Sequence, residues 1–173
     1  KPINNLANIY SGYYGDKNKA MEYYTNGLDI CEKYNLLEEE MILLNNIGEI
    51  HMENHDYEKA KENIEKSKKI ANDIEDYRII FTTTMNLGQI YLVTGDFDSC
   101  FNCYYLAKEG FEKRSIQNKE ITCQYYNFLG EFYFKFGKYD EALEHSLKAV
   151  KYCTDFDLEW LLDAKSRVVL IKY

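Results

Sequence analysis

The sequence predicts an all-α protein built from stacked helical hairpins. The 173 residues contain one proline, Pro2, and nine glycines, which are too few breakers for the frequent turns of an all-β fold. Hydrophobic residues make up 46% of the chain and charged residues 29%, the balance of a folded protein. A short motif also recurs every 40 to 42 residues, which is typical of a helical repeat array.

The repeated motif has a small residue at its second position and an aromatic ring at its fifth. Its four copies are residues 6–10, 47–51, 87–91 and 129–133. In the last three copies the small residue is glycine, and another small residue follows it by twelve positions, giving the pairs Gly48 and Ala60, Gly88 and Cys100, and Gly130 and Ala142. In the first copy Ala7 replaces the glycine, and Ala20 follows one residue later than this spacing.

This pattern predicts a pair of helices in each copy. A glycine inside a helix costs about 1 kcal/mol relative to alanine, so its recurrence indicates close approach by a second helix. The downstream small residue supplies the reciprocal contact. Between them, turns such as Gly15-Asp16 and His55-Asp56 end one helix and cap the next, because the aspartate accepts from free backbone amides.

Each predicted hairpin has a first and a second helix. First helices are expected at 3–13, 37–53, 78–93 and 118–135, second helices at 17–33, 57–73, 97–113 and 139–153, and a ninth helix at 157–173. These form one array over residues 1–173, with repeats at about 3–35, 36–75, 76–115 and 116–155 and the first helix of a fifth at 157–173. The chain begins at Lys1 and ends at Tyr173 in an apolar run, so we expect a fragment of a longer protein that self-associates through its last helix or leaves it frayed.

These residues resemble the tetratricopeptide repeat (TPR) family. The third copy carries the resemblance through Leu87, Gly88, Tyr91, Gly95, Tyr104 and Ala107, and the fourth through Leu129, Gly130, Tyr133, Gly137, Ala142 and Ala149. The repeats are near 40 residues where the usual unit has 34, and the proline that commonly closes each unit is missing. The resemblance implies a right-handed α-α superhelix, similar to the extended TPR arrays of bacterial Rap-type regulators and GGDEF proteins. A composition rich in Lys, Asn, Ile and Tyr is typical of an AT-rich bacterial genome.

Charge and hydropathy limit the classes of partner. The formal net charge of −8 opposes binding to nucleic acid and to anionic membranes. The chain contains no apolar run long enough to cross a membrane and no signal peptide at its start, so we expect a cytoplasmic protein. The odd number of cysteines, five, predicts reduced thiols rather than a disulfide framework.

The motifs that could carry chemistry favour structural roles. Cys100-x-x-Cys103 lacks a second pair of ligands for zinc and lies inside a predicted helix, so we interpret it as core packing rather than a metal or redox site. His51 takes the place of a tyrosine and is expected to pack. Nothing in the spacing places a base beside a nucleophile. We therefore expect no catalytic residues, no metal and no cofactor.

The candidate binding surface is the inward face of the first helices, which lines the groove of stacked hairpins. Its residues are Asn5, Asn8, Asn45, Asn46, Glu49, Asn86, Gln89, Asn127 and Glu131. An amide offers a donor and an acceptor together, which suits the backbone of an extended peptide, and asparagines do this in peptide-binding TPR proteins. The alternative is that AT-rich coding scatters asparagine over the whole chain.

The leading interpretation is a non-catalytic module that binds a protein or peptide, as the sensory or regulatory part of a bacterial cytosolic signalling protein. Peptide in the groove would change the curvature of the superhelix and pass that change to another domain. A second interpretation is a static scaffold for protein complexes. A third is a catalytic or metal-binding domain hidden among the helices.

Overall fold

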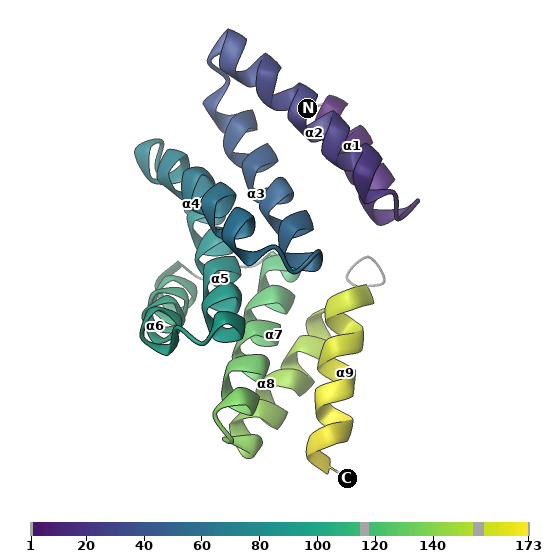
Figure 1. Cartoon of the computed structure of the whole chain (residues 1–173). Helices are drawn as coiled ribbons and strands as arrows, with labels where there is room; N and C mark the ends of the chain where they lie inside the picture. The colour runs from purple at the N-terminus through teal and green to yellow at the C-terminus, as the bar shows by residue number, and fades with distance from the viewer. Residues whose placement is uncertain (1, 115–117, 154–157, 173) are drawn as a thin grey trace. The chain divides into compact units, whose positions relative to one another are not determined.

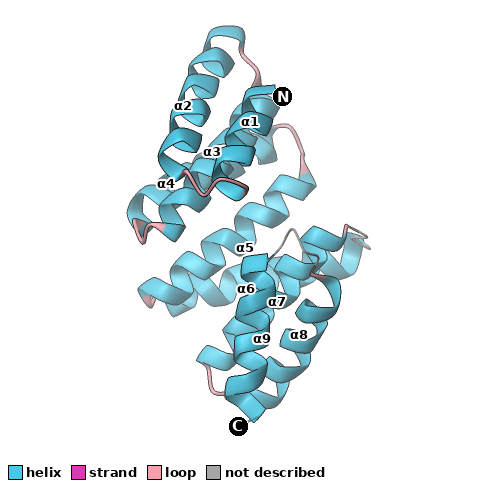
Figure 2. Ribbon diagram, turned by 90° about the vertical axis from the view of Figure 1, so that its right-hand side faces the viewer, coloured by secondary structure: helices cyan, strands magenta, loops and turns pink. Residues whose placement is uncertain are grey.

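The computed structural model describes residues 2–114, 118–153 and 158–172, and every regular element within these ranges is an α-helix (Figures 1 and 2). The helices are α1 (Pro2–Gly12), α2 (Lys17–Tyr34), α3 (Leu37–Glu53), α4 (Tyr57–Asp73), α5 (Tyr77–Thr94), α6 (Phe97–Arg114), α7 (Lys119–Lys135), α8 (Tyr139–Tyr152) and α9 (Leu158–Lys172). The all-α prediction is confirmed. Each predicted helix end lies within one residue of an observed one, except that residues 157 and 173 lie outside the described ranges.

The chain divides into two compact units, Lys1–Ile90 and Tyr91–Tyr173, with the division near the end of α5. In the first unit α1 packs against α2, α3 packs against α4, and α2 contacts α3. In the second unit α7 packs against α8, and α9 contacts both of them. The hairpins follow the sequence repeat, whereas a single array over the whole chain stays a prediction.

The turn inside each hairpin follows the predicted pattern. Gly15, Gly95 and Gly137 have φ of 65°, 83° and 71°, a left-handed conformation that glycine adopts without strain. His55 occupies the same position with φ of 60°. In three of these turns the following aspartate caps the next helix: Asp16 accepts from the Lys19 amide at 3.0 Å, Asp56 from the Lys59 amide at 3.4 Å, and Asp96 from the Ser99 amide at 3.2 Å. In the fourth, Lys138 follows Gly137 and makes no side-chain cap.

Two of the repeated glycines lie where the helices of a hairpin approach most closely. A Cβ atom on Gly48 would collide with the side chain of Ile64 and lie 3.3 Å from the Ala60 carbonyl oxygen. A Cβ atom on Gly130 would lie 2.6 Å from Ser146 Oγ and 3.3 Å from its backbone nitrogen. The predicted close approach of the second helix is therefore confirmed at these two glycines.

The small residues that follow the glycines are core residues. Ala20, Ala60, Cys100 and Ala142 are all fully buried. Burial raises the pKa of Cys100 to about 12, so its thiol is neutral at physiological pH. Cys103 is also buried as a free thiol. The packing role predicted for this pair is consistent with that burial.

Helix α9 buries one stripe and exposes another. Ala164 and Arg167 are buried, and α9 contacts α7 and α8. Leu162, Val169 and Leu170 are 54%, 56% and 67% exposed. The apolar run at the end of the sequence is thus partly uncovered, as expected from its length.

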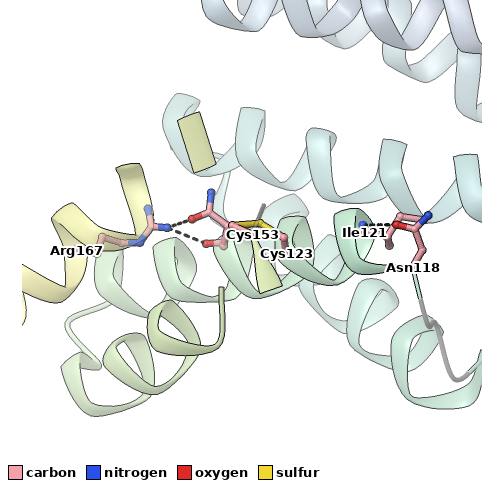
Figure 3. The surroundings of a disulfide bond; sticks show 6 residues. Asn118, Ile121, Cys123, Cys153 and Arg167 are labelled. Atoms are coloured by element: carbon pink, nitrogen blue, oxygen red, sulfur yellow. Dashed lines mark hydrogen bonds between the residues drawn. A yellow bond between two sulfur atoms is a disulfide. The ribbon is translucent and has the colours of Figure 1, made fainter. Parts of the chain in front are cut away.

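One prediction about the cysteines is wrong. A disulfide joins Cys123 on α7 to Cys153, which follows α8 directly (Figure 3). Only Cys31, Cys100 and Cys103 among the described cysteines are free thiols. The two partners are 30 residues apart in sequence, and the α7–α8 hairpin brings them together. The cytoplasmic expectation rested on the lack of a membrane-spanning run and of a signal peptide, and the disulfide does not favour it because stable disulfides are rare in the cytosol.

Reduction of the disulfide should destabilise the second unit. The bond closes a loop of about 30 residues, and its loss releases that loop in the unfolded chain at a cost of about 3 to 4 kcal/mol. Urea unfolding followed by circular dichroism, with and without dithiothreitol, measures the difference. The free energy of unfolding of the double variant Cys123→Ala with Cys153→Ala should be the same with and without dithiothreitol. Equal stability of the native chain in both conditions would contradict the assignment.

Candidate functional site

Several predicted inward residues of the first unit, together with Asn4, form side-chain hydrogen bonds between successive first helices. We call this set the amide ladder; its members are Asn4, Asn8, Asn45, Asn46, Glu49 and Asn86. Asn46 Nδ2 donates to Asn4 Oδ1 at 2.9 Å and to Asn8 Oδ1 at 3.2 Å, which connects α3 to α1. Asn8 Oδ1 also accepts from the Tyr24 hydroxyl at 2.6 Å.

The second rung of the ladder connects α3 to α5. Asn86 Nδ2 donates to Asn45 Oδ1 at 3.1 Å and to Glu49 Oε1 at 3.0 Å. Asn45 Nδ2 donates to the same Glu49 oxygen at 2.8 Å. Asn45 and Asn86 are only 5% and 2% exposed, so these bonds satisfy polar groups that water does not reach.

The carboxylates of Glu49 and Glu53 interact with residues of α2 beside the ladder. Burial raises the pKa of Tyr24 to about 12, and the negative charge of Glu49 adds to the rise. Tyr24 therefore keeps its proton at neutral pH and serves as a donor to Asn8. Glu53, one turn beyond Glu49, forms an ion pair with Lys17 Nζ at 2.7 Å, which joins the end of α3 to the start of α2.

In the second unit the corresponding asparagine contacts a buried cation. Arg167 Nη2 on α9 donates to the carbonyl oxygen of Asn127 at 3.4 Å and to its side-chain oxygen (Figure 3). Arg167 Nε lies 3.4 Å from Ser146 Oγ on α8. Burial lowers the pKa of the Arg167 guanidinium, and the nearby carboxylate of Glu131 opposes that shift. Arg167 thus links α9 to both helices of the preceding hairpin.

The structure separates the predicted site residues into two groups. Asn45, Asn86 and Asn127 are buried, and their side chains are hydrogen-bonded to neighbouring helices. The accessible group consists of Asn5, Asn8, Asn46, Glu49, Gln89 and Glu131, which are exposed or half-buried. Glu131 and Asn127 belong to the second unit, and the other predicted residues belong to the first. A peptide-binding role for the set stays a prediction.

Sequence reasoning did not anticipate that the asparagines bond to one another. The signal was present in their spacing, because Asn45 and Asn86 are 41 residues apart and Asn4 and Asn46 are 42 apart, close to the repeat period. The role of Arg167 as a partner of Asn127, 40 residues away, follows the same period. Recurrent polar residues at one repeat position indicate rungs between stacked helices as well as ligand contacts.

Over residues 2–114, 118–153 and 158–172, no three His, Cys, Asp or Glu side chains gather in a way that could hold a metal ion. In the same ranges, no helix combines the length and the apolar character that crossing a membrane requires.

Comparison with known proteins gives matches across most of the chain. The model of the tetratricopeptide repeat family matches residues 39–113 and again 79–155. The anaphase-promoting complex subunit CDC16 of Saccharomyces cerevisiae is 25% identical over 134 residues, which are 77% of this chain and 14% of that protein. The response regulator aspartate phosphatase J of Bacillus subtilis is 25% identical over 143 residues, which are 80% of this chain and 36% of that protein. The chain therefore spans well under two thirds of the length of either relative.

Removal of the buried amide of Asn86 should destabilise the first unit. Asn86→Ala removes the Asn86 donor from the buried Asn45 side-chain oxygen and one of two amide donors from Glu49 Oε1, which costs about 1 to 3 kcal/mol of the free energy of unfolding. Urea unfolding followed by circular dichroism measures the loss. Asn5→Ala, at an exposed position on α1, is the control and should change stability by less than about 0.5 kcal/mol. If both variants unfold like the native chain, the ladder does not stabilise the stack.

Proposed function

Because this chain belongs to the tetratricopeptide repeat family, we propose that it is a non-catalytic module that binds another protein or a peptide. Repeats of this family form scaffolds for protein–protein interaction. The ligand expected from the amide-rich first helices is an extended peptide. Its backbone would be read by side chains that carry a donor and an acceptor at once.

The observation that supports this proposal is the accessible part of the candidate site. Asn5 on α1, Asn46 on α3 and Gln89 on α5 are exposed or half-buried, and each comes from a different first helix of the same unit. The hydrogen bonds of the ladder hold these helices against one another, which fixes the backbone that carries the accessible amides. A pre-organised row of amides loses little entropy when it binds a ligand.

The finer part of the proposal is a regulatory role in a bacterial signalling protein. The supporting observation is the similarity to a Bacillus subtilis protein that is named as a response regulator phosphatase. In this role peptide binding changes the curvature of the stacked hairpins, and the change reaches another part of the protein. A cytoplasmic location belongs to the same proposal.

A static scaffold is the second candidate. The similarity to CDC16, which is named as a subunit of the anaphase-promoting complex, favours it. The two candidates differ in what ligand binding does to the fold. A regulator changes its dimensions when peptide binds, whereas a scaffold keeps them.

Peptides selected on this chain should bind through the accessible amides. Heptapeptides chosen by phage display against the immobilised chain provide the probes, and isothermal titration calorimetry gives their affinities. Asn5→Ala with Gln89→Ala should weaken binding about fivefold to 100-fold, since each lost hydrogen bond costs about 0.5 to 1.5 kcal/mol. Asn18→Ala, an exposed asparagine on the second helix α2, is the matched control.

Unchanged affinity in the double variant would place the peptide elsewhere, and failure to select any peptide would contradict peptide binding. The selected complexes also separate the two candidates. A smaller or larger radius of gyration in small-angle X-ray scattering on peptide binding supports the regulator. An unchanged radius supports the scaffold.

Self-association through α9 is a further part of the proposal. The exposed side chains of Leu162, Val169 and Leu170 form an uncovered apolar stripe, and burying it against a second copy removes it from water. Val169→Lys with Leu170→Lys should shift the chain toward monomer in sedimentation velocity at a concentration where the native chain associates. Leu147→Lys on α8, at a position 46% exposed, is the control. A native chain that stays monomeric at high concentration would contradict this.

A further inference from the structure

A pocket of about 410 Å³ lies in the first unit. Its walls come from the ends of α2, α3 and α5, beside the two turns that join one hairpin to the next, and from the ladder residue Asn4 on α1. The apolar part of the lining includes Ile30, Cys31, Leu36 and Met41. Glu38, Glu39, Asp76 and Arg78 are the charged residues of the lining.

Backbone conformation fixes the shape of this pocket. Helix α2 is capped by Asn35, whose φ of 53° turns the chain so that Leu36 enters the wall. Helix α4 is capped by Ile74, and Glu75 after it is left-handed, with φ of 58°. Asp76 then caps α5 by accepting from the amides of Arg78 at 3.0 Å and Ile79 at 3.1 Å. The pocket therefore rests on two capped helix ends rather than on a long loop.

The floor of the pocket is apolar. Met41 and Cys31 are 1% and 2% exposed and lie beneath it, while Ile30 and Leu36 are 39% and 38% exposed at its opening. Burial raises the pKa of Cys31, and the charges of Glu39 and Glu40 add to the rise, so its thiol forms a neutral wall. An apolar group that covers these half-exposed side chains removes apolar surface from water, which favours its binding in the pocket.

The rim of the pocket carries an excess of negative charge. Glu38 and Glu39 extend from the first turn of α3, and Asp76 belongs to the same lining. Arg78, with Nη2 4.0 Å from Asp76 Oδ2, is the one cation among the described residues that line the pocket. A wider hollow of about 710 Å³ shares Leu36, Glu38, Glu39 and Asp76 and adds Glu75. Both openings thus favour a positively charged ligand.

We propose that this pocket binds a segment of a partner protein in which an apolar side chain lies next to lysine or arginine. The apolar side chain enters the hollow between Ile30 and Leu36, and the basic side chain contacts Glu38 and Glu39. The volume suits one aliphatic side chain together with the stem of a neighbouring lysine. The pocket is a second interaction surface, and it does not rest on peptide binding by the amides of the first helices.

The test titrates the ¹⁵N-labelled 173-residue chain with short capped peptides and follows the backbone amides by nuclear magnetic resonance. Acetyl-Lys-Leu-Lys-amide should shift the amides of Ile30, Leu36 and Met41, and the shifts should weaken with added salt. Acetyl-Lys-Ser-Lys-amide tests the apolar contact and should bind more weakly. Acetyl-Glu-Leu-Glu-amide tests the charge and should leave these amides unshifted.

Glu38→Gln with Glu39→Gln should weaken the affinity for acetyl-Lys-Leu-Lys-amide about threefold to tenfold, because two exposed charge contacts are lost. Glu58→Gln is the matched control, since Glu58 is the second residue of α4 as Glu38 is of α3. The control should bind like the native chain.

Three outcomes would overturn the proposal: no shift at the pocket amides, unchanged affinity after removal of both carboxylates, or equal binding of the serine peptide. Loss of binding in Asn5→Ala with Gln89→Ala would also overturn it, because the peptide would then lie on the accessible amides. Failure of the phage-selected peptides to bind would leave this result unaffected. The two proposals can therefore fail separately.

Discussion

The close approach of two helices at a glycine determines how the α3–α4 and α7–α8 hairpins pack. At Gly48 the neighbouring helix brings Ile64 and the Ala60 carbonyl into the space that a side chain would fill, and Ser146 does the same at Gly130. The left-handed turn residue and the capping aspartate then set where the second helix begins. A hairpin built in this way has one face already used for internal packing. Stacking against other hairpins has to use the remaining faces of the first helix.

That division of faces explains the amide ladder. When first helices stack, the polar side chains on their shared face come within hydrogen-bonding distance, and those that lose water must bond to one another. Asn45, Asn86 and Glu49 do so, and Asn127 bonds to Arg167 in the second unit. The same residue type therefore occupies two environments on one surface. Buried amides hold the stack, whereas amides such as Asn5 and Gln89 stay accessible to water.

The sequence predicts local structure here better than it predicts pairing. Helix ends followed from turn residues such as Gly95 and from caps such as Asp96, which act through neighbours in the chain. Burial of Asn86 and pairing of Cys123 with Cys153 depend on how helices from different parts of the sequence meet. Spacing along the chain predicts which helix face an asparagine occupies. It does not predict whether a side chain from the next repeat will cover that face.

The ladder also limits how this sequence can diverge. Its hydrogen bonds join positions 37 to 42 residues apart, in successive repeats. A homologue that replaces Asn86 with an apolar residue removes the donor to the buried side-chain oxygen of Asn45, so selection favours a second change in the earlier repeat. Paired substitutions about one repeat apart should therefore mark the rungs in an alignment of related sequences. Positions that vary alone, without such a partner, should mark the surface free to adapt to different ligands.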